Sequence, residues 1–295
     1  MSATESSSRP SGPAVYLSYT QDELNRAFDQ TQWAPNMMQV VGSWGEISRG
    51  VREHASAMQA RRYGDGFNED LEIFPAAAPN APVYIFMHGG EWKRRDNLSG
   101  AFPALSLVHA GFTYVNLNFE ALPHVRLPHI VDQVRRAVVW VYNNARDYGA
   151  NPGAIHLFGH SSGAHLAAVL ATTRWQDFGV PADVLKSVSC VSGLYDMEPV
   201  MLSMRREWVK LTPEEGRELS PVHHVSNVNC PVSIVYGENE SPEFKRQARV
   251  FHEVLLVAKK QSRLISVADR NHFELLDTLR EPGSELEKLL VNSRF

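Results

Sequence analysis

Apolar residues along the chain gather in short continuous runs that alternate with stretches of helical period. Residues 83–87 read Val-Tyr-Ile-Phe-Met without interruption, a pattern typical of a strand buried on both faces. From residue 128 onward, apolar residues recur at steps of three and four, which predicts one face of a helix that ends near Gly149. Because this alternation continues along the chain, it predicts an α/β fold with a mostly parallel central sheet and helices on both of its faces.

The remaining predicted elements follow from the same two patterns. Strands are expected at 71–74, 112–117, 155–158, 188–191, 232–236 and 264–267. Helices are expected at 21–28, over much of 37–60, and at 164–170, 244–258 and 273–279. In sheets of this kind ligands bind beyond the carboxyl ends of the strands. Polar and glycine-rich segments that directly follow a strand are therefore the candidates for a functional site.

The N-terminal segment differs in composition from the rest of the chain. Residues 1–18 begin with a run of small and polar residues, which we interpret as a disordered tail, and residues 19–295 are expected to form a single α/β domain. Within that domain, residues 20–60 are a possible helical lid or cover. Alternatively, they form an oligomer face, which would make a homodimer possible, or they pack in the core. The tail lacks the basic and apolar blocks of a signal peptide, so we expect a cytoplasmic protein.

Composition excludes several classes of function. The net charge is −4 and the pI about 6.3, which gives no indication of nucleic acid or an anionic membrane as partner. Cys190 and Cys230 each adjoin an apolar run and are expected to be buried thiols. The sequence contains no HExxH, CxxC or GxGxxG motif, so we expect neither a metal site nor a bound cofactor.

One motif indicates chemistry directly. Residues 159–163 read Gly-His-Ser-Ser-Gly between an apolar run and a stretch of small residues, which is G-x-S-x-G in a strand–turn–helix context. A serine on such a tight turn holds its hydroxyl where a base can reach it, and the flanking glycines relieve backbone crowding. Ser161 is therefore the candidate nucleophile of a serine hydrolase.

A second motif supplies donors for a developing negative charge. His88-Gly89-Gly90 follows the strand that ends at residue 87, and glycines there allow backbone N–H groups to point at a substrate oxygen. The N–H groups of Gly89 and Gly90, with that of Ser162, would form an oxyanion hole.

The base and the acid should follow later strands. His272 lies in a polar loop between the last predicted strand and helix, and an imidazole is suited to accept the serine proton. Three carboxylates are candidates for the acid: Glu240 and Glu238 after the strand ending at 236, and Asp196 after the preceding strand. The chain order serine, acid, histidine is that of known hydrolases.

These segments together resemble the kynurenine formamidases (arylformamidases) of the α/β-hydrolase fold. The resemblance rests on HGGxW at 88–92, GHSSGAHL at 159–166, SGLYD at 192–196, ESPEFKRQ at 240–247 and NHFEL at 271–275. It implies a triad of Ser161, Glu240 and His272, with Glu240 taken as the acid because it directly precedes Ser-Pro-Glu-Phe. The family more often has aspartate there, so the longer glutamate requires its loop to retreat slightly.

The resemblance implies hydrolysis of an N-formyl arylamine such as N-formylkynurenine, as in tryptophan catabolism. Trp92, His88 and Tyr195 are then candidate substrate contacts. Trp92 could form a wall that favours small acyl groups, and the alternative is that it packs in the core. The alternative for His88 is a structural role in which it hydrogen-bonds its own loop. Two other functions stay open: a carboxylesterase or hydrolase of another small amide, carbamate or lactone, and a non-catalytic small-molecule-binding protein. In each case the expected partner is a small molecule such as an aryl formamide or a small ester.

Overall fold

The computed structural model describes residues 12–94 and 97–292. In that part of the chain, eight strands form one sheet in the order β10-β9-β8-β7-β5-β6-β4-β3, parallel from β10 to β6 and antiparallel at β4 and β3. The strands are β3 Gln59–Arg62, β4 Asp70–Phe74, β5 Ala81–Met87, β6 Thr113–Leu117, β7 Ala150–His160, β8 Leu185–Val191, β9 Val232–Gly237 and β10 Ser262–Val267. The predicted α/β fold with a mostly parallel sheet is confirmed.

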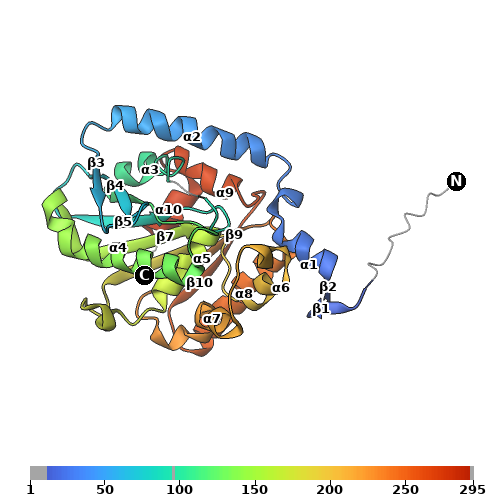
Figure 1. The fold of residues 1–295 in the computed structure, drawn as a ribbon. Helices are drawn as coiled ribbons and strands as arrows, with labels where there is room; N and C mark the ends of the chain where they lie inside the picture. The colour runs from blue at the N-terminus through green and yellow to red at the C-terminus, as the bar shows by residue number, and fades with distance from the viewer. Residues whose placement is uncertain (1–11, 95–96, 293–295) are drawn as a thin grey trace.

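Helices cover both faces of this sheet (Figure 1). They are α1 Gln21–Phe28, α2 Met37–His54, α3 Ala104–His109, α4 Leu127–Asn144, α5 Ser162–Ala171, α6 Glu198–Leu202, α7 Pro213–Glu218, α8 Pro242–Val257, α9 Glu274–Asp277 and α10 Glu285–Val291. Helices α4, α5 and α8 pack on one face, and α2, α3, α9 and α10 on the other. The predicted helices at 21–28, 164–170 and 244–258 therefore exist within a few residues of their expected bounds.

Strand β5 shows why its apolar run has no polar alternation. Successive side chains of a strand point to opposite faces. Val83, Ile85 and Met87 join the core shared with α4, α5 and α8, whereas Tyr84 and Phe86 join the core under α2, α3 and α9. All five side chains are buried. A strand in the middle of a sheet covered on both faces can thus be predicted from continuous hydrophobicity alone.

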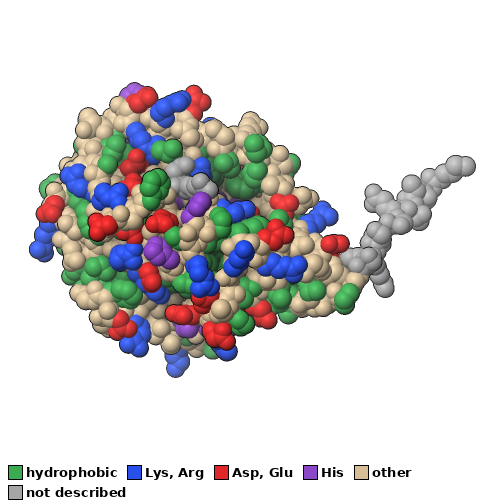
Figure 2. Space-filling model, in the orientation of Figure 1, with side chains coloured by type: hydrophobic (Ala, Val, Ile, Leu, Met, Phe, Trp, Pro, Cys, Tyr) green, Lys and Arg blue, Asp and Glu red, His purple; other side chains and the backbone are tan. Residues whose placement is uncertain are grey.

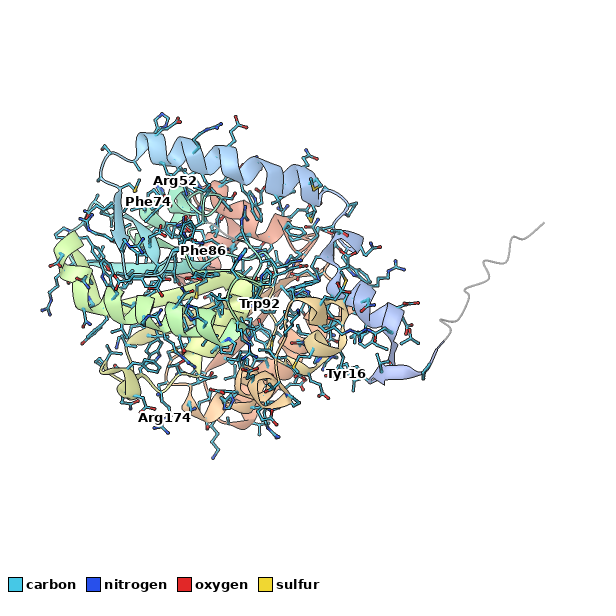
Figure 3. The ribbon with its side chains drawn as sticks, in the orientation of Figure 1. Tyr16, Arg52, Phe74, Phe86, Trp92 and Arg174 are labelled. Carbon is cyan, nitrogen blue, oxygen red and sulfur yellow. The ribbon has the colours of Figure 1, made fainter. Side chains whose placement is uncertain are left out.

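One predicted bound near the N-terminus is wrong. Residues Ala14–Tyr16, placed by the sequence in a disordered tail, form strand β1, which pairs with β2 Tyr19–Thr20. The hydroxyl of Tyr16, a residue labelled in Figure 3, donates to Asp196 and accepts from Arg246, and these contacts hold the strand against the domain. Residues 1–11 of the expected tail lie outside the described residues. The helix expected over much of 37–60 is confirmed as α2, which ends at His54, and residues 59–62 form edge strand β3.

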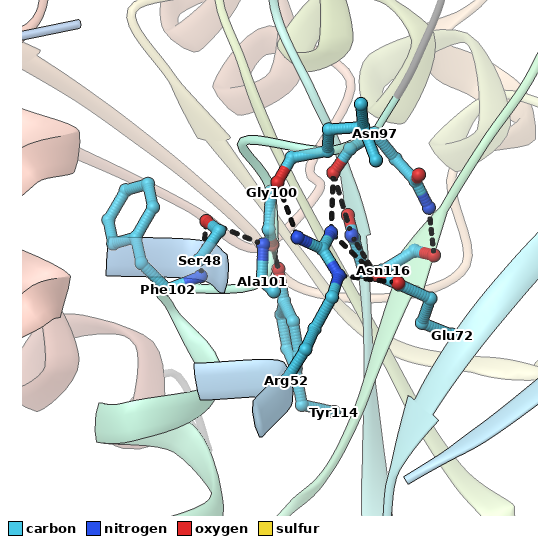
Figure 4. A network of polar contacts seen from close by, with 10 residues as sticks. Ser48, Arg52, Glu72, Asn97, Gly100, Ala101, Phe102, Tyr114 and Asn116 are labelled. Atoms are coloured by element: carbon cyan, nitrogen blue, oxygen red, sulfur yellow. Dashed lines mark hydrogen bonds and ion pairs between the residues drawn. The ribbon is translucent and has the colours of Figure 1, made fainter. Parts of the chain in front are cut away.

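A polar network fixes the carboxyl end of α2 to the sheet (Figure 4). The Arg52 guanidinium donates to both oxygens of Glu72 on β4, at 2.6 and 2.9 Å, and to the carbonyl of Asn97. The Asn116 amide on β6 donates to the same Glu72 carboxylate. One turn earlier, the Ser48 hydroxyl accepts from the N–H groups of Ala101 and Phe102. These bidentate and buried bonds make α2 a fixed part of the fold.

The surface carries charges of both signs. On the face drawn in Figure 2, lysine and arginine side chains are interspersed with aspartate and glutamate, without a large field of one sign. This distribution agrees with the small net charge of −4. Within 12–94 and 97–292, the structure contains no helix with the length and apolarity that crossing a bilayer requires.

Candidate active site

The expected site residues meet at one edge of the sheet, at the carboxyl ends of four parallel strands. Gly89 and Gly90 follow β5, Ser161 follows β7, Glu240 follows β9 and His272 follows β10. After β5 the chain adds β6 on one side and then returns to add β7 on the other. Strands β5 and β7 therefore flank the point where the strand order reverses, which is where open α/β sheets bind ligands.

Ser161 occupies a strained turn between β7 and α5. Its backbone has φ 56° and ψ −120°, a combination that costs a non-glycine residue on the order of 1–3 kcal/mol and persists only where the surroundings enforce it. Its N–H donates to the Val191 carbonyl at 2.9 Å. The Ser161 hydroxyl makes no hydrogen bond to any described residue, so it is available to a ligand.

The two glycines of the motif are required by backbone crowding. A Cβ at Gly163 would overlap the carbonyl groups of Met87 and His88, and a Cβ at Gly159 would overlap the Gly163 carbonyl. The turn can therefore pass close to the end of β5 only if both positions lack a side chain. This close passage places the Ser161 turn beside the Gly89-Gly90 loop.

We expect Gly163→Ala to destabilise the fold by about 3 kcal/mol or more, because the new methyl group meets backbone atoms that cannot rotate away. Urea unfolding followed by circular dichroism measures the change. Gly42→Ala is the matched control: Gly42 lies in α2, a methyl group added there would meet nothing within 4 Å, and the protein should gain about 0.5–1 kcal/mol. A Gly163→Ala protein as stable as the wild type would contradict the crowding argument.

The loop after β5 has an unusual backbone. Gly90, Glu91 and Trp92 all have positive φ, at 115°, 57° and 58°. Within the described part of the chain, the N–H groups of Gly89 and Gly90, like that of Ser162, donate to no protein acceptor. Unpaired backbone N–H groups in a turn and at a helix N-terminus can donate hydrogen bonds to an anionic oxygen. The geometry is thus compatible with the oxyanion hole that the sequence predicts.

Trp92 does not contact the cavity, which corrects its assignment as a substrate contact. Its side chain is 2% exposed and packs edge-on against His165, with ring centroids 5.2 Å apart; in Figure 3 it lies in the interior near the strand ends. The backbone N–H of Trp92 donates to the Ser162 hydroxyl at 3.2 Å, and its backbone carbonyl accepts from the Leu122 N–H at 2.8 Å. Trp92 therefore holds the strained loop against α5 by packing in the core.

Tyr195 is also placed in the core and not at the cavity. It is fully buried, and its ring stacks on Phe251 at 4.5 Å. Its phenol lies against Gly193, where a Cβ would fall 2.5 Å from the hydroxyl oxygen. His88 does line the cavity, stacks on Phe119 at 4.4 Å and has Nδ1 2.9 Å from the Gly89 carbonyl. The loop-bonding alternative for His88 is thus compatible with its position.

Glu240 is the candidate acid that contacts His272. Its Oε2 accepts from His272 Nδ1 at 3.1 Å, and both side chains are buried. Its Oε1 accepts from the Ser192 hydroxyl at 2.6 Å and from the Gly237 N–H at 2.7 Å. The rivals contact other groups: Asp196 bonds Tyr16, and Glu238 is exposed. These two donors hold the second oxygen of Glu240 in place.

His160 is a site residue for which sequence reasoning assigned no role. Its Nε2–H donates to the His272 carbonyl at 2.7 Å, and the two rings lie 4.8 Å apart. Burial, together with the nearby His272, lowers the pKa of His160 to about 3, so the ring stays neutral and keeps this proton at physiological pH. Its position inside G-x-S-x-G was the available signal. His160 fixes the backbone of the loop that carries His272.

Ser161 and His272 line the same cavity of about 140 Å³. Aromatic walls come from Trp44, Phe86 and Phe273, and polar walls from Gln30, Glu91, Arg94 and Arg205. The volume is small beside the ~300–1,000 Å³ of typical ligand pockets. This favours a small substrate.

The N-terminal helices cover this cavity. Gln30, Met37, Val41 and Trp44 come from the segment expected as a lid or cover. The Trp44 indole donates to Asp277 at 2.9 Å, and the Asn36 amide is bonded to both Asn271 and Glu274 beside His272. These bonds tie the cover to the histidine loop.

Two further expectations concern cysteines and metals. Cys190 and Cys230 are buried free thiols, as predicted. Among the residues that the structure describes, no group of three or more His, Cys, Asp or Glu side chains is arranged to hold a metal ion.

Comparison with known proteins finds hydrolases with similar sequences. A family model described as BD-FAE matches residues 70–255. The chain is 30% identical to the kynurenine formamidase of Salmo salar, over 92% of this chain and 95% of that protein. It is 29% identical to the kynurenine formamidase of Danio rerio, over 94% and 97% of the two chains. Esterase LipQ of Mycobacterium tuberculosis is 30% identical over 69% of this chain and 54% of its own length.

Solved structures agree on the fold. A putative thioesterase from Silicibacter sp. TM1040 superposes with a TM-score of 0.79 at 23% identity, covering 91% of this chain and 98% of its own. A hyperthermophilic esterase from Pyrobaculum calidifontis superposes with a TM-score of 0.70 at 16% identity, covering 89% and 93%. At these identities the likeness is one of architecture.

Proposed function

Since this chain belongs to the kynurenine formamidases, a family of hydrolases with the α/β-hydrolase fold, we propose that it hydrolyses an N-formyl arylamine such as N-formylkynurenine to the arylamine and formate. The observation that carries the proposal is the cavity that brings Ser161 and His272 together, with His272 bonded to Glu240 at 3.1 Å. The full-length match to curated formamidases supports the choice of substrate over other acyl compounds.

The first half-reaction forms a formyl-enzyme. The Ser161 oxygen attacks the formyl carbon while His272 Nε2 accepts the hydroxyl proton, and Glu240 stabilises the resulting imidazolium through Nδ1. The N–H groups of Gly89, Gly90 and Ser162 bind the tetrahedral oxyanion, each worth about 3 kcal/mol of transition-state stabilisation. His272 then returns the proton to the aniline nitrogen as the C–N bond breaks.

The second half-reaction regenerates the enzyme. A water molecule replaces the arylamine, loses a proton to His272 and attacks the formyl ester carbon. The ester bond to Ser161 breaks, the serine oxygen regains a proton from His272, and formate leaves. The aryl group suits this chemistry because an arylamine leaves more easily than an alkylamine. The aromatic side chains of Trp44, Phe86 and Phe273 in the cavity wall would contact its ring.

Steady-state kinetics with three substrates test the proposal. We expect kcat/KM on N-formylkynurenine to exceed that on p-nitrophenyl acetate by at least about tenfold, and that on N-acetylkynurenine by about a hundredfold, since the extra methyl group must enter a small cavity. The second candidate, a carboxylesterase, is favoured by the match to Esterase LipQ. Rapid turnover of p-nitrophenyl acetate without measurable release of formate from N-formylkynurenine would establish that alternative and refute the formamidase.

A further inference from the structure

A buried arginine lines the candidate active site. Arg205 lies in the 3₁₀ helix η4 Met204–Glu207, and its side chain is 1% exposed. Its guanidinium carries five N–H donors and stays charged in proteins. One nitrogen, Nη2, donates to the Phe28 carbonyl at 2.8 Å and lies 3.5 Å from a Glu91 oxygen. The other two nitrogens, Nε and Nη1, are buried and have no hydrogen-bond partner among the described residues.

This incomplete pairing is unfavourable in the protein alone. Burying a charge without full compensation is energetically costly. The rings of Phe28 and Phe244 lie 5.4 and 5.7 Å from the guanidinium carbon, and their cation–π attraction offsets part of this desolvation cost. Burial lowers the pKa of Arg205, and Glu91 and Asp29 oppose that shift. A neutral side chain of similar length would pack between these rings without the penalty, so packing alone does not explain an arginine here.

Gln30 is an independent second observation at the same place. It lines the cavity and is 6% exposed, and both polar atoms of its amide are buried without a hydrogen-bond partner among the described residues. Phe28, whose carbonyl accepts from Arg205, lies only two residues before it. The cavity thus carries, besides the catalytic candidates, a guanidinium and an amide that both retain unused donors.

We propose that the guanidinium of Arg205, assisted by the Gln30 amide, binds a carboxylate of the substrate and makes the enzyme specific for N-formyl arylamines that carry a carboxylate. The carboxylate would accept from an unused N–H of the guanidinium through one oxygen, and the NH₂ of the Gln30 amide would donate to its other oxygen. The inference rests on the proposed function for the identity of the scissile group. Arg205 is a specificity-determining residue and takes no part in proton transfer.

The test compares two substrates that differ in one group. N-formylkynurenine carries the carboxylate, and N-formylkynuramine is the same molecule without it. We expect Arg205→Met to lower kcat/KM on N-formylkynurenine by about a hundredfold and on N-formylkynuramine by less than about threefold. Arg205→Lys keeps the charge but loses the planar group, and should fall in between. Arg206→Met is the matched control: this neighbour is exposed and does not line the cavity, so both rates should stay unchanged.

A binding measurement separates failure of this inference from failure of the proposed function. Inhibition of p-nitrophenyl acetate hydrolysis by 4-oxo-4-phenylbutanoate and by its neutral amide needs no formamidase activity. We expect wild type to bind the anion at least about tenfold more tightly than the amide, and Arg205→Met to remove that difference. Should N-formylkynurenine not be cleaved while this inhibition pattern holds, the formamidase proposal fails and the carboxylate site stands.

Equal losses on both substrates, or equal inhibition of wild type by anion and amide, would overturn the carboxylate site. Because Arg205 also holds the Phe28 carbonyl, urea unfolding checks that Arg205→Met folds. If it does not, Gln30→Leu and Arg205→Lys replace it, with the same expectation of a loss confined to the substrate that carries the carboxylate. The carboxylate site is likewise overturned if these variants affect the two substrates alike.

Discussion

We expect Ser161→Ala to lower kcat by about 10⁴- to 10⁶-fold while leaving the fold intact, the range known for loss of a serine nucleophile. The Ser161 hydroxyl bonds no described residue, so its removal breaks no protein hydrogen bond. The strained backbone at φ 56° is retained because alanine keeps the Cβ. Release of formate from N-formylkynurenine measures the activity. The midpoint temperature of thermal unfolding should change by no more than about 2 °C.

Ser189→Ala is the control for this change. Ser189 is a buried serine on β8 whose hydroxyl makes no hydrogen bond within the described residues, and its loss should leave kcat unaltered. A fluorophosphonate probe should label wild type and Ser189→Ala at Ser161 and should not label Ser161→Ala. Absence of labelling in wild type would favour the non-catalytic binding protein, and residual activity above about 1% in Ser161→Ala would exclude this serine as nucleophile.

We expect Glu240→Gln to lower kcat by about 10³- to 10⁴-fold with little change in KM. The amide oxygen is retained by the donors Ser192 and Gly237, at 2.6 and 2.7 Å, so the amide NH₂ must face His272 Nδ1. A donor there requires Nδ1 to accept, which moves the ring proton to Nε2. The imidazole can then no longer accept the proton of Ser161.

Glu238→Gln and Asp196→Asn are the controls, since the sequence alone left all three acids open. Glu238 is exposed and Asp196 bonds Tyr16, so each control should retain at least about half of the wild-type kcat. Steady-state rates on N-formylkynurenine decide among them. The assignment of Glu240 would be wrong if Glu240→Gln kept more than about a tenth of the activity while one of the controls lost it.

The sequence was most informative where a single physical requirement sets the residue type. Strand β5 could be predicted because burial on both faces demands an unbroken apolar run, and the serine turn because its crowding excludes any Cβ at Gly159 and Gly163. Edge strand β3, by contrast, reads Gln-Ala-Arg-Arg and is largely exposed. It is held by backbone bonds to β4, and such bonds leave no hydrophobic signal in a sequence.

The sequence by itself thus determined the class of fold, the serine turn and the place of the histidine after the last strand, because hydrophobic period and steric crowding act within a few residues. The tertiary structure decided which acid contacts His272, that Trp92 and Tyr195 belong to the core, and that His160, Gln30 and Arg205 border the cavity. Glu240 lies 32 residues from its histidine, and Arg205 lies 177 residues from the carbonyl it bonds. The residues next to Arg205 in the sequence do not distinguish it from the other 28 lysines and arginines. Its burial and its hydrogen-bond partners depend on distant segments that meet only once the sheet has assembled.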